Sequence, residues 1–270
     1  MDLTFRNVHN FCARIDLSED RPTVDLSAVT WLEPYAIIYL GMLLRHHNRL
    51  GRFFKLIYPS KPGTKDYLTR QNFWERFQFT PDPKNDRRLL HSMPNTSFKD
   101  IIDLEDKPDQ AEEVSFRLWE IMQNSAVAID PRDVTEAAAE LVDNFVQHAE
   151  QGLAAMMVQY YPNYHCLRLA VGDCGIGIRQ SLTNSGRYPE IAAMSHQEAI
   201  AEAFKDEVTR KEVGGMGFGS VQNIVCKQSA ELFISSFDGC VYIDNRGKMY
   251  YRDTPHELPG VQVEICFPER

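Results

Sequence analysis

The sequence predicts a chain of mixed α/β and α+β class, built from two β-sheet regions that are each covered by helices. Strand-like and helix-like segments alternate within residues 1–79, which is typical of a small α/β domain. Prolines among polar residues then interrupt the pattern over 80–110 and predict a linker. Residues 111–270 combine amphipathic helices with several strands, so we predict an α+β sandwich, a mixed sheet with helices on one face.

In the first region, short apolar runs at 22–26 and 53–58 predict two strands. A long apolar stretch over 33–50, followed by Gly51, predicts a buried helix that stops at the glycine. Aromatic residues spaced along 66–77 predict a second, amphipathic helix.

In the second region, helical periodicity appears over 111–122, 133–148 and 197–204, and again from Gly219 onward. Asp133 is suited to cap its helix, because Glu136 follows three residues later as in a capping box. The expected strands cover six segments, namely 153–161, 166–172, 231–235, 240–244, 249–252 and 261–267.

The bulk composition limits the classes of function. The 270 residues are 43% hydrophobic and 25% charged, which is ordinary for a globular protein. A net charge of −9 argues against a general nucleic-acid binder, which needs a cationic face. The N-terminus lacks the layout of a signal peptide, and the longest apolar run, 35–44, is too short to span a bilayer. With six scattered cysteines and no metal-type spacing, we expect a cytoplasmic protein with reduced thiols.

The helix over 133–148 carries the first chemical motif. Glu140, Asn144 and His148 are spaced four residues apart and therefore share one stripe of the helix. An amide oxygen at Asn144 can ligate a Mg²⁺ ion that keeps most of its waters, while Glu140 can act on an attacking water. An ordinary polar helix face is the alternative explanation of this stripe.

A second motif follows the strand predicted over 166–172. Asp173 is followed by Gly175, Gly177 and Ile178, and glycines at these positions let the backbone approach a flat ligand. The Asp173 carboxylate, an acceptor of hydrogen bonds, could take one from an exocyclic amine such as that of adenine. A structural glycine-rich turn explains the same residues without a ligand.

A third motif is a glycine-rich run that opens the helix predicted from Gly219. Backbone amides at such a helix start can bind phosphate. Lys211, just before the glycines, could reach the same phosphates, although exposed loop charges are commoner than phosphate ligands. The candidate residues of this run are Gly215, Gly217, Phe218, Gly219 and Ser220.

These three motifs together resemble the boxes of the GHKL ATPases, the group that includes DNA gyrase, heat-shock chaperones and histidine kinases. The resemblance covers about residues 111–268 and implies a Bergerat-type ATP-binding fold. It implies that Glu140 is a general base, that Asn144 holds Mg²⁺ and that Asp173 binds the adenine amine. The glycines of the third motif would line the phosphates and a lid.

One position departs from the pattern of that family, and a separate region of the chain resembles a different domain. The family often has a Gly-Thr pair near the last strand, where Gly260 is here followed by Val261. Residues 20–79 resemble, more weakly, a STAS domain, but Glu33-Pro34-Tyr35-Ala36 offers no serine of the kind that is phosphorylated there. This region would then be a docking or regulatory module.

Three functions fit the sequence. The first is a regulatory switch that binds ATP and Mg²⁺, hydrolyses ATP slowly and signals its state to a protein partner through the N-terminal region. The second is a serine protein kinase of the anti-sigma-factor type, acting on a partner protein. The third is a nucleotide-binding scaffold without turnover, which has no need of a base at Glu140. The sequence leaves the partner and the oligomeric state open, a homodimer included.

Overall fold

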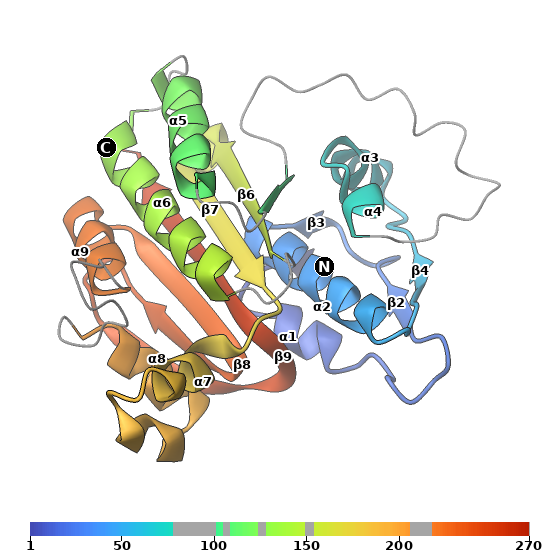
Figure 1. Ribbon diagram of the computed structural model, residues 1–270. Helices are drawn as coiled ribbons and strands as arrows, with labels where there is room; N and C mark the ends of the chain where they lie inside the picture. Colours follow the sequence, from blue (N-terminus) through green and yellow to red (C-terminus); the bar gives the residue numbers. More distant parts are fainter. Residues whose placement is uncertain (78–100, 105–108, 124–127, 149–153, 206–217, 270) are drawn as a thin grey trace.

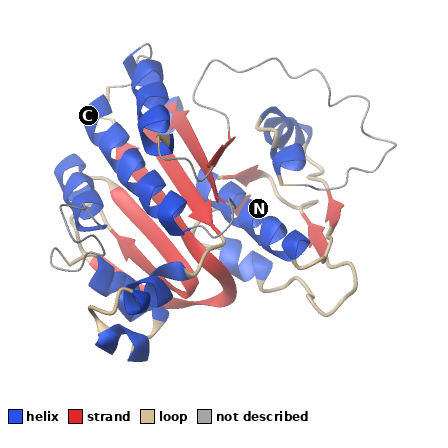
Figure 2. Cartoon of the chain, viewed as in Figure 1, coloured by secondary structure: helices blue, strands red, loops and turns tan. Residues whose placement is uncertain are grey.

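The computed structural model describes residues 1–77, 101–104, 109–123, 128–148, 154–205 and 218–269 (Figure 1). The described chain is an α+β structure with one antiparallel sheet of five strands in the order β5-β6-β7-β9-β8 (Figure 2). The sheet strands are β5 (Ile101–Leu104), β6 (Ala154–Tyr161), β7 (Cys166–Asp173), β8 (Glu231–Ile243) and β9 (Met249–Pro268).

Helices cover both faces of this sheet. One face carries α5 (Gln110–Gln123), α6 (Pro131–His148) and α9 (Phe218–Gln228), with α7 (Gly177–Asn184) and α8 (His196–Ala203) beside its lower end (Figure 1). Strand side chains alternate between the faces. Leu169 and Val171 therefore join the core under α6, whereas Ala170 faces the other way.

The N-terminal segment covers the second face. It comprises α1 (Val8–Cys12), α2 (Pro34–Arg49), α3 (Pro62–Arg70) and α4 (Phe73–Arg76), together with β1 (Asp2–Leu3), β2 (Thr23–Asp25), β3 (Trp31–Leu32) and β4 (Lys55–Ile57). These short strands form two parallel pairs, β1 with β3 and β2 with β4. The apolar side chains of α2 share one core with residues from β5 to β9, so α2 lies directly behind the sheet.

Both ends of α2 are fixed by charges of the sheet. The Glu264 carboxylate of β9 accepts the Tyr35 N–H at 2.9 Å, and a negative charge at a helix N-terminus is favourable. Arg168 of β7 donates to Glu264 at 2.7 Å and to Glu33 at 2.9 Å. Near the other end, Arg45 pairs with Asp103 of β5 and donates to the Ala154 carbonyl.

Several sequence predictions need correction. The sheet is antiparallel among its described strands, not mixed, and helices cover both of its faces instead of one. Residues 101–104, assigned to the linker, form edge strand β5. The helix expected over 66–77 divides into α3 and α4, because Asn72 adopts a left-handed conformation (φ 53°) between them. The division of the chain at 79 and 110 stays a prediction.

Two further predictions differ from the structure, one on how a helix begins and one on where strands are interrupted. Asp133 does not cap its helix: α6 begins at Pro131, and the Asp133 carboxylate instead accepts from Lys227 at 2.8 Å and from Gln228, both on α9. The four strands expected after residue 230 are two long ones. A bulge at Phe237 (φ 56°) carries β8 through the segment that the sequence suggested as a break.

The remaining described elements are two short 3₁₀ helices, Pro162–Tyr164 and Pro189–Ala193. None of the helices in the described part of the chain combines the length and the apolar character that a bilayer crossing requires.

Candidate functional site

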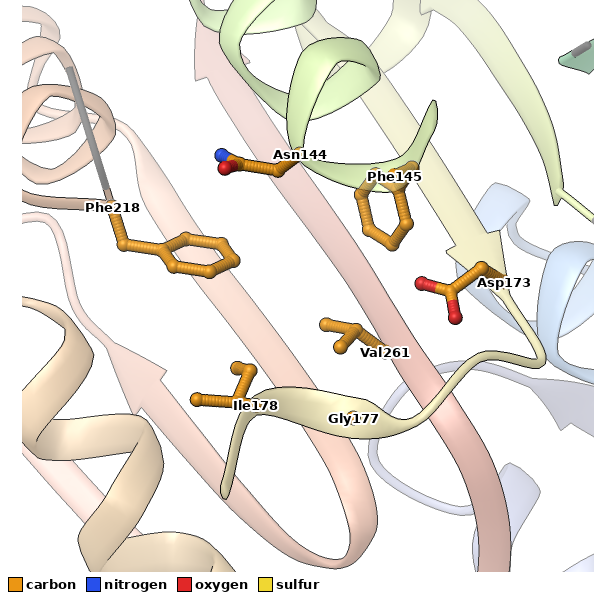
Figure 3. A pocket seen from close by; sticks show the side chains of 7 residues that line it. All are labelled: Asn144, Phe145, Asp173, Gly177, Ile178, Phe218 and Val261. Carbon is orange, nitrogen blue, oxygen red and sulfur yellow. The ribbon is translucent and has the colours of Figure 1, made fainter. Parts of the chain in front are cut away.

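A pocket opens between α6, α7, α9, the end of β7 and the middle of β9, at the place where the sequence motifs meet. It encloses about 300 Å³, part of it open to solvent. Its lining includes Asn144, Asp173, Gly177, Ile178 and Phe218, five residues that the sequence singled out. Figure 3 shows Phe218 on one side and Asp173 on the other, with apolar side chains between them.

Asp173 is the last residue of β7, and its side chain is almost fully buried. Its carboxylate accepts a hydrogen bond from the backbone N–H of Gly175. Its carbonyl accepts one from the Gln262 side chain at 3.0 Å. These bonds hold the turn that follows β7 in place around the carboxylate.

Gly260 makes the close approach to Asp173 possible. It has φ +91°, and a Cβ built on it would lie 2.2 Å from the Asp173 carbonyl oxygen and 2.5 Å from Oδ1. Only glycine fits such a position without a shift of the neighbouring backbone. At the floor of the pocket, the end of β7 and the middle of β9 are therefore in direct contact.

Gly177 begins α7 and has φ +73°. A Cβ there would lie 2.7 Å from both the Phe237 ring and the Ser236 hydroxyl oxygen. The same hydroxyl accepts the Ile178 N–H at 3.2 Å and donates to the Gly260 carbonyl at 3.0 Å. Ser236 thus connects the start of α7 to the strand that supports Asp173, although no motif in the sequence marks it as a site residue.

Glu140 and Asn144 lie on α6 as the spacing predicts. The Asn144 amide donates to Glu140 Oε1 at 3.2 Å, so the two polar groups act as one unit. Glu140 is buried and contributes no surface to the pocket, whereas Asn144 is half-buried and lines it. Phe145, the next residue of the helix, places its ring in the pocket (Figure 3).

Phe145 and Val261 complete the apolar walls, and the sequence analysis gave neither a role in the pocket. Both follow a residue that it discussed, Asn144 and Gly260, but apolar side chains beside a site look like ordinary core residues in a sequence. Val261 stands at the position where the resemblance to the GHKL ATPases would lead one to expect threonine. The wall at this point is therefore a methyl surface without a hydroxyl.

Other candidate residues are only partly placed. Gly219 and Ser220 lie in the first turn of α9 and do not line the pocket. Gly215, Gly217 and Lys211 fall outside the described residues. His148 is the last residue of α6, and its side chain is likewise outside what the structure describes.

The pocket combines apolar surface with one buried hydrogen-bond acceptor group. Phe145, Ile178 and Val261 offer apolar surface to a flat ring, and the Asp173 carboxylate offers an acceptor at one end. The described residues contain no group of three His, Cys, Asp or Glu side chains that could hold a metal alone. A Mg²⁺ ion bound through Asn144 and phosphate oxygens does not need such a group.

Comparisons with known proteins leave the family open. No family model matches the chain, and no curated protein matches it. A solved structure of a mycobacterial sensor histidine kinase, MprB, superposes with a TM-score of 0.32 and 19% identity, covering 53% of this chain and 77% of that one. A likeness of this degree does not assign a family, and nothing in the comparisons supports the STAS-like resemblance of residues 20–79.

Proposed function

We propose that the chain is an ATP- and Mg²⁺-binding regulatory switch that hydrolyses ATP slowly and signals its nucleotide state to a protein partner. The observation that carries this proposal is the meeting of Asn144, Asp173 and Phe218 at one pocket, from three elements distant in sequence. The resemblance of the three motifs to GHKL ATPases supports the same function, independently of the pocket.

The roles follow from the positions of the side chains. Asp173 would hold the exocyclic amine of adenine, with Phe145, Ile178 and Val261 against the base. Asn144 would hold the magnesium ion, which neutralises phosphate charge when bound. Glu140, hydrogen-bonded to the Asn144 amide, would accept the proton of the attacking water.

Contacts of α2 support a link between this site and the N-terminal segment. The Cys174 thiol, between Asp173 and Gly175, donates to the Met42 carbonyl at 3.3 Å. A Cβ on Gly172 would lie 2.6 Å from Ile38, so helix and strand touch at the residue before Asp173. A partner that moves α2 would therefore act directly on the strand end that carries Asp173.

A protein kinase of the anti-sigma-factor type is the second candidate, because it would use the same ATP pocket. Incubation with ATP labelled on its terminal phosphate separates the candidates. Free labelled phosphate indicates a hydrolase, and label on a partner protein indicates a kinase. Binding without either product indicates a scaffold.

Replacement of the base tests the catalytic role. We expect Glu140→Ala to retain ATP binding and to lose turnover by about 10²-fold or more, the usual contribution of a general base. Free phosphate release and calorimetric ATP binding are measured on the same preparation. Equal turnover in wild type and Glu140→Ala would refute the assignment.

A further inference from the structure

A second pocket lies on the opposite face of the sheet, away from the candidate nucleotide site. It encloses about 480 Å³, part of it open to solvent. Phe5 and Arg6 of the N-terminal turn form one side. Phe233 and Tyr242 of β8 and Arg252 of β9 form the other.

Two guanidinium groups line this pocket without a carboxylate partner among the described residues. Arg6 lies over the Phe5 ring at 5.1 Å. Arg252 lies over the Phe233 ring at 5.8 Å and donates to the Cys240 sulfur and the Phe5 carbonyl. Carboxylates lie nearby, since Asp244 accepts a hydrogen bond from the Tyr250 hydroxyl at 3.1 Å. Neither guanidinium is paired with a carboxylate of the described residues, so both keep donors for an anionic ligand.

Aromatic rings form most of the remaining surface. Phe5 stacks on Phe233 with centroids 4.8 Å apart and on Tyr242 at 5.7 Å. Tyr250 and Tyr251 stand at the mouth, and Tyr251 is 52% exposed. Exposed aromatic side chains beside a cavity offer stacking surface that the protein itself does not cover.

The aromatic rings and the two guanidinium groups together indicate the chemical class of the ligand. A guanidinium binds a carboxylate or phosphate through charge-assisted hydrogen bonds, and a planar ring stacks on Phe and Tyr faces. We propose that this pocket binds a small aromatic anion, a molecule that joins one aryl ring to a carboxylate or a phosphate. Arg6 and Arg252 bind the acidic group, and the exposed ring of Tyr251 at the mouth contacts the aryl group.

The proposal does not depend on ATP binding, since the two pockets share no lining residue. Phenyl phosphate is the test ligand, titrated into the full chain by isothermal calorimetry. Inorganic phosphate supplies the charge without the ring, and benzyl alcohol supplies the ring without the charge. We expect phenyl phosphate to bind at least about tenfold more tightly than either compound.

Single substitutions then test whether phenyl phosphate binds at this pocket. Arg6→Gln and Arg252→Gln each remove one cation, and each is expected to weaken phenyl phosphate binding about tenfold. Arg14→Gln removes the same charge from an exposed position outside the pocket and serves as the matched control. The Arg6 side chain is exposed, so Arg6→Gln tests the site even where Arg252→Gln impairs folding.

Asp173→Asn distinguishes this pocket from the nucleotide site, and it is expected to leave phenyl phosphate binding unchanged. Absence of uptake by the wild type, or equal affinity for inorganic phosphate, would overturn the proposal. So would an affinity that falls in Asp173→Asn while both arginine variants match Arg14→Gln.

Discussion

Contact between Gly260 and Asp173 is the residue-scale feature on which the candidate nucleotide site depends. The carboxylate is held by the Gly175 N–H, by the turn that follows β7, and by a strand that approaches it without a side chain. Buried carboxylates in such a fixed environment present their acceptor oxygens in one direction. The direction at Asp173 is into the pocket (Figure 3).

Substitution of Gly260 tests this contact. Gly260→Ala should destabilise the fold, because its Cβ would overlap the Asp173 backbone and carboxylate. Gly186→Ala is the matched control: Gly186 also has a positive φ, +70°, but nothing lies within 4 Å of its added Cβ. Urea unfolding should show a loss about 1–3 kcal/mol larger for Gly260→Ala than for Gly186→Ala. Equal losses of unfolding free energy would mean that the positive φ of Gly260 matters and its contact with Asp173 does not.

At this scale the polar residues of the site were more predictable than the apolar ones. Asp173 and Gly177 were identifiable because an acid and glycines directly follow a predicted strand, and Asn144 because it lies one turn from Glu140 on the same stripe of its helix. Phe145 and Val261 were not, because the same side chains would serve equally well in a core. Ser236 was missed since its role depends on a register between strands that the sequence does not reveal.

At the scale of elements, a buried contact joins the helices that form two walls of the pocket. Asp133 in the first turn of α6 accepts hydrogen bonds from Lys227 and Gln228 at the end of α9. Asp133 and Gln228 are buried, whereas the Lys227 side chain is 64% exposed. The amide contact should therefore stabilise the helix pair more than the ion pair does.

Two substitutions separate these contributions. Asp133→Ala leaves the buried Gln228 amide without this acceptor and should lower the free energy of unfolding by about 1–3 kcal/mol. Lys227→Gln removes only the exposed partner and should change stability little. Urea denaturation measures both variants. A larger loss in Lys227→Gln than in Asp133→Ala would contradict the proposed order.

The sequence predicted where the longer helices and strands lie better than it predicted which surfaces pack against them. The helix over 33–50 was expected to be buried because its residues are apolar on nearly every side, and α2 is indeed buried along most of its length. What covers it was not predictable, because burial of a helix does not specify the partner surface. The strand at 101–104 was missed because four residues beside a proline-rich stretch carry too little pattern.

At the scale of the whole molecule, buried histidines lie where the N-terminal segment meets the sheet. His9 of α1 contacts the Tyr35 hydroxyl at 3.0 Å, and His256 of β9 contacts the Tyr39 hydroxyl at 2.8 Å. Burial lowers the pKa of His9 to about 3 and that of His256 to about 4. Both rings are therefore neutral at pH 7, and protonating them opposes the packing of α1 and α2 on the sheet.

This packing predicts a loss of stability in mild acid. Because the pKa of each histidine is lower in the folded chain than the ordinary 6.5, the unfolded chain binds more protons between pH 6.5 and about 4. The contribution of these histidines to stability should be fully present above pH 6.5 and be lost as the pH drops through this range. Unfolding free energies are compared between wild type and His9→Gln over the range.

Wild type and variant must be compared because Glu33 changes the stability with pH in the opposite sense to the histidines. Burial raises the pKa of Glu33 to about 7, so its protonation in mild acid stabilises the fold. We expect His9→Gln to flatten the acid-induced loss relative to wild type. Equal slopes in the two proteins would show that His9 does not contribute.

The measurement that tests the central claim most directly is calorimetric titration of the full chain with ATP and Mg²⁺. We predict binding by the wild type and a loss of about tenfold or more in affinity for Asp173→Asn, which replaces an acceptor oxygen by a donor amide without a change of shape. Asp238→Asn, at an exposed position of β8, is the matched control and should bind like the wild type. No heat of binding with the wild type, or equal affinity in Asp173→Asn and Asp238→Asn, would contradict the assignment of this pocket to an adenine nucleotide.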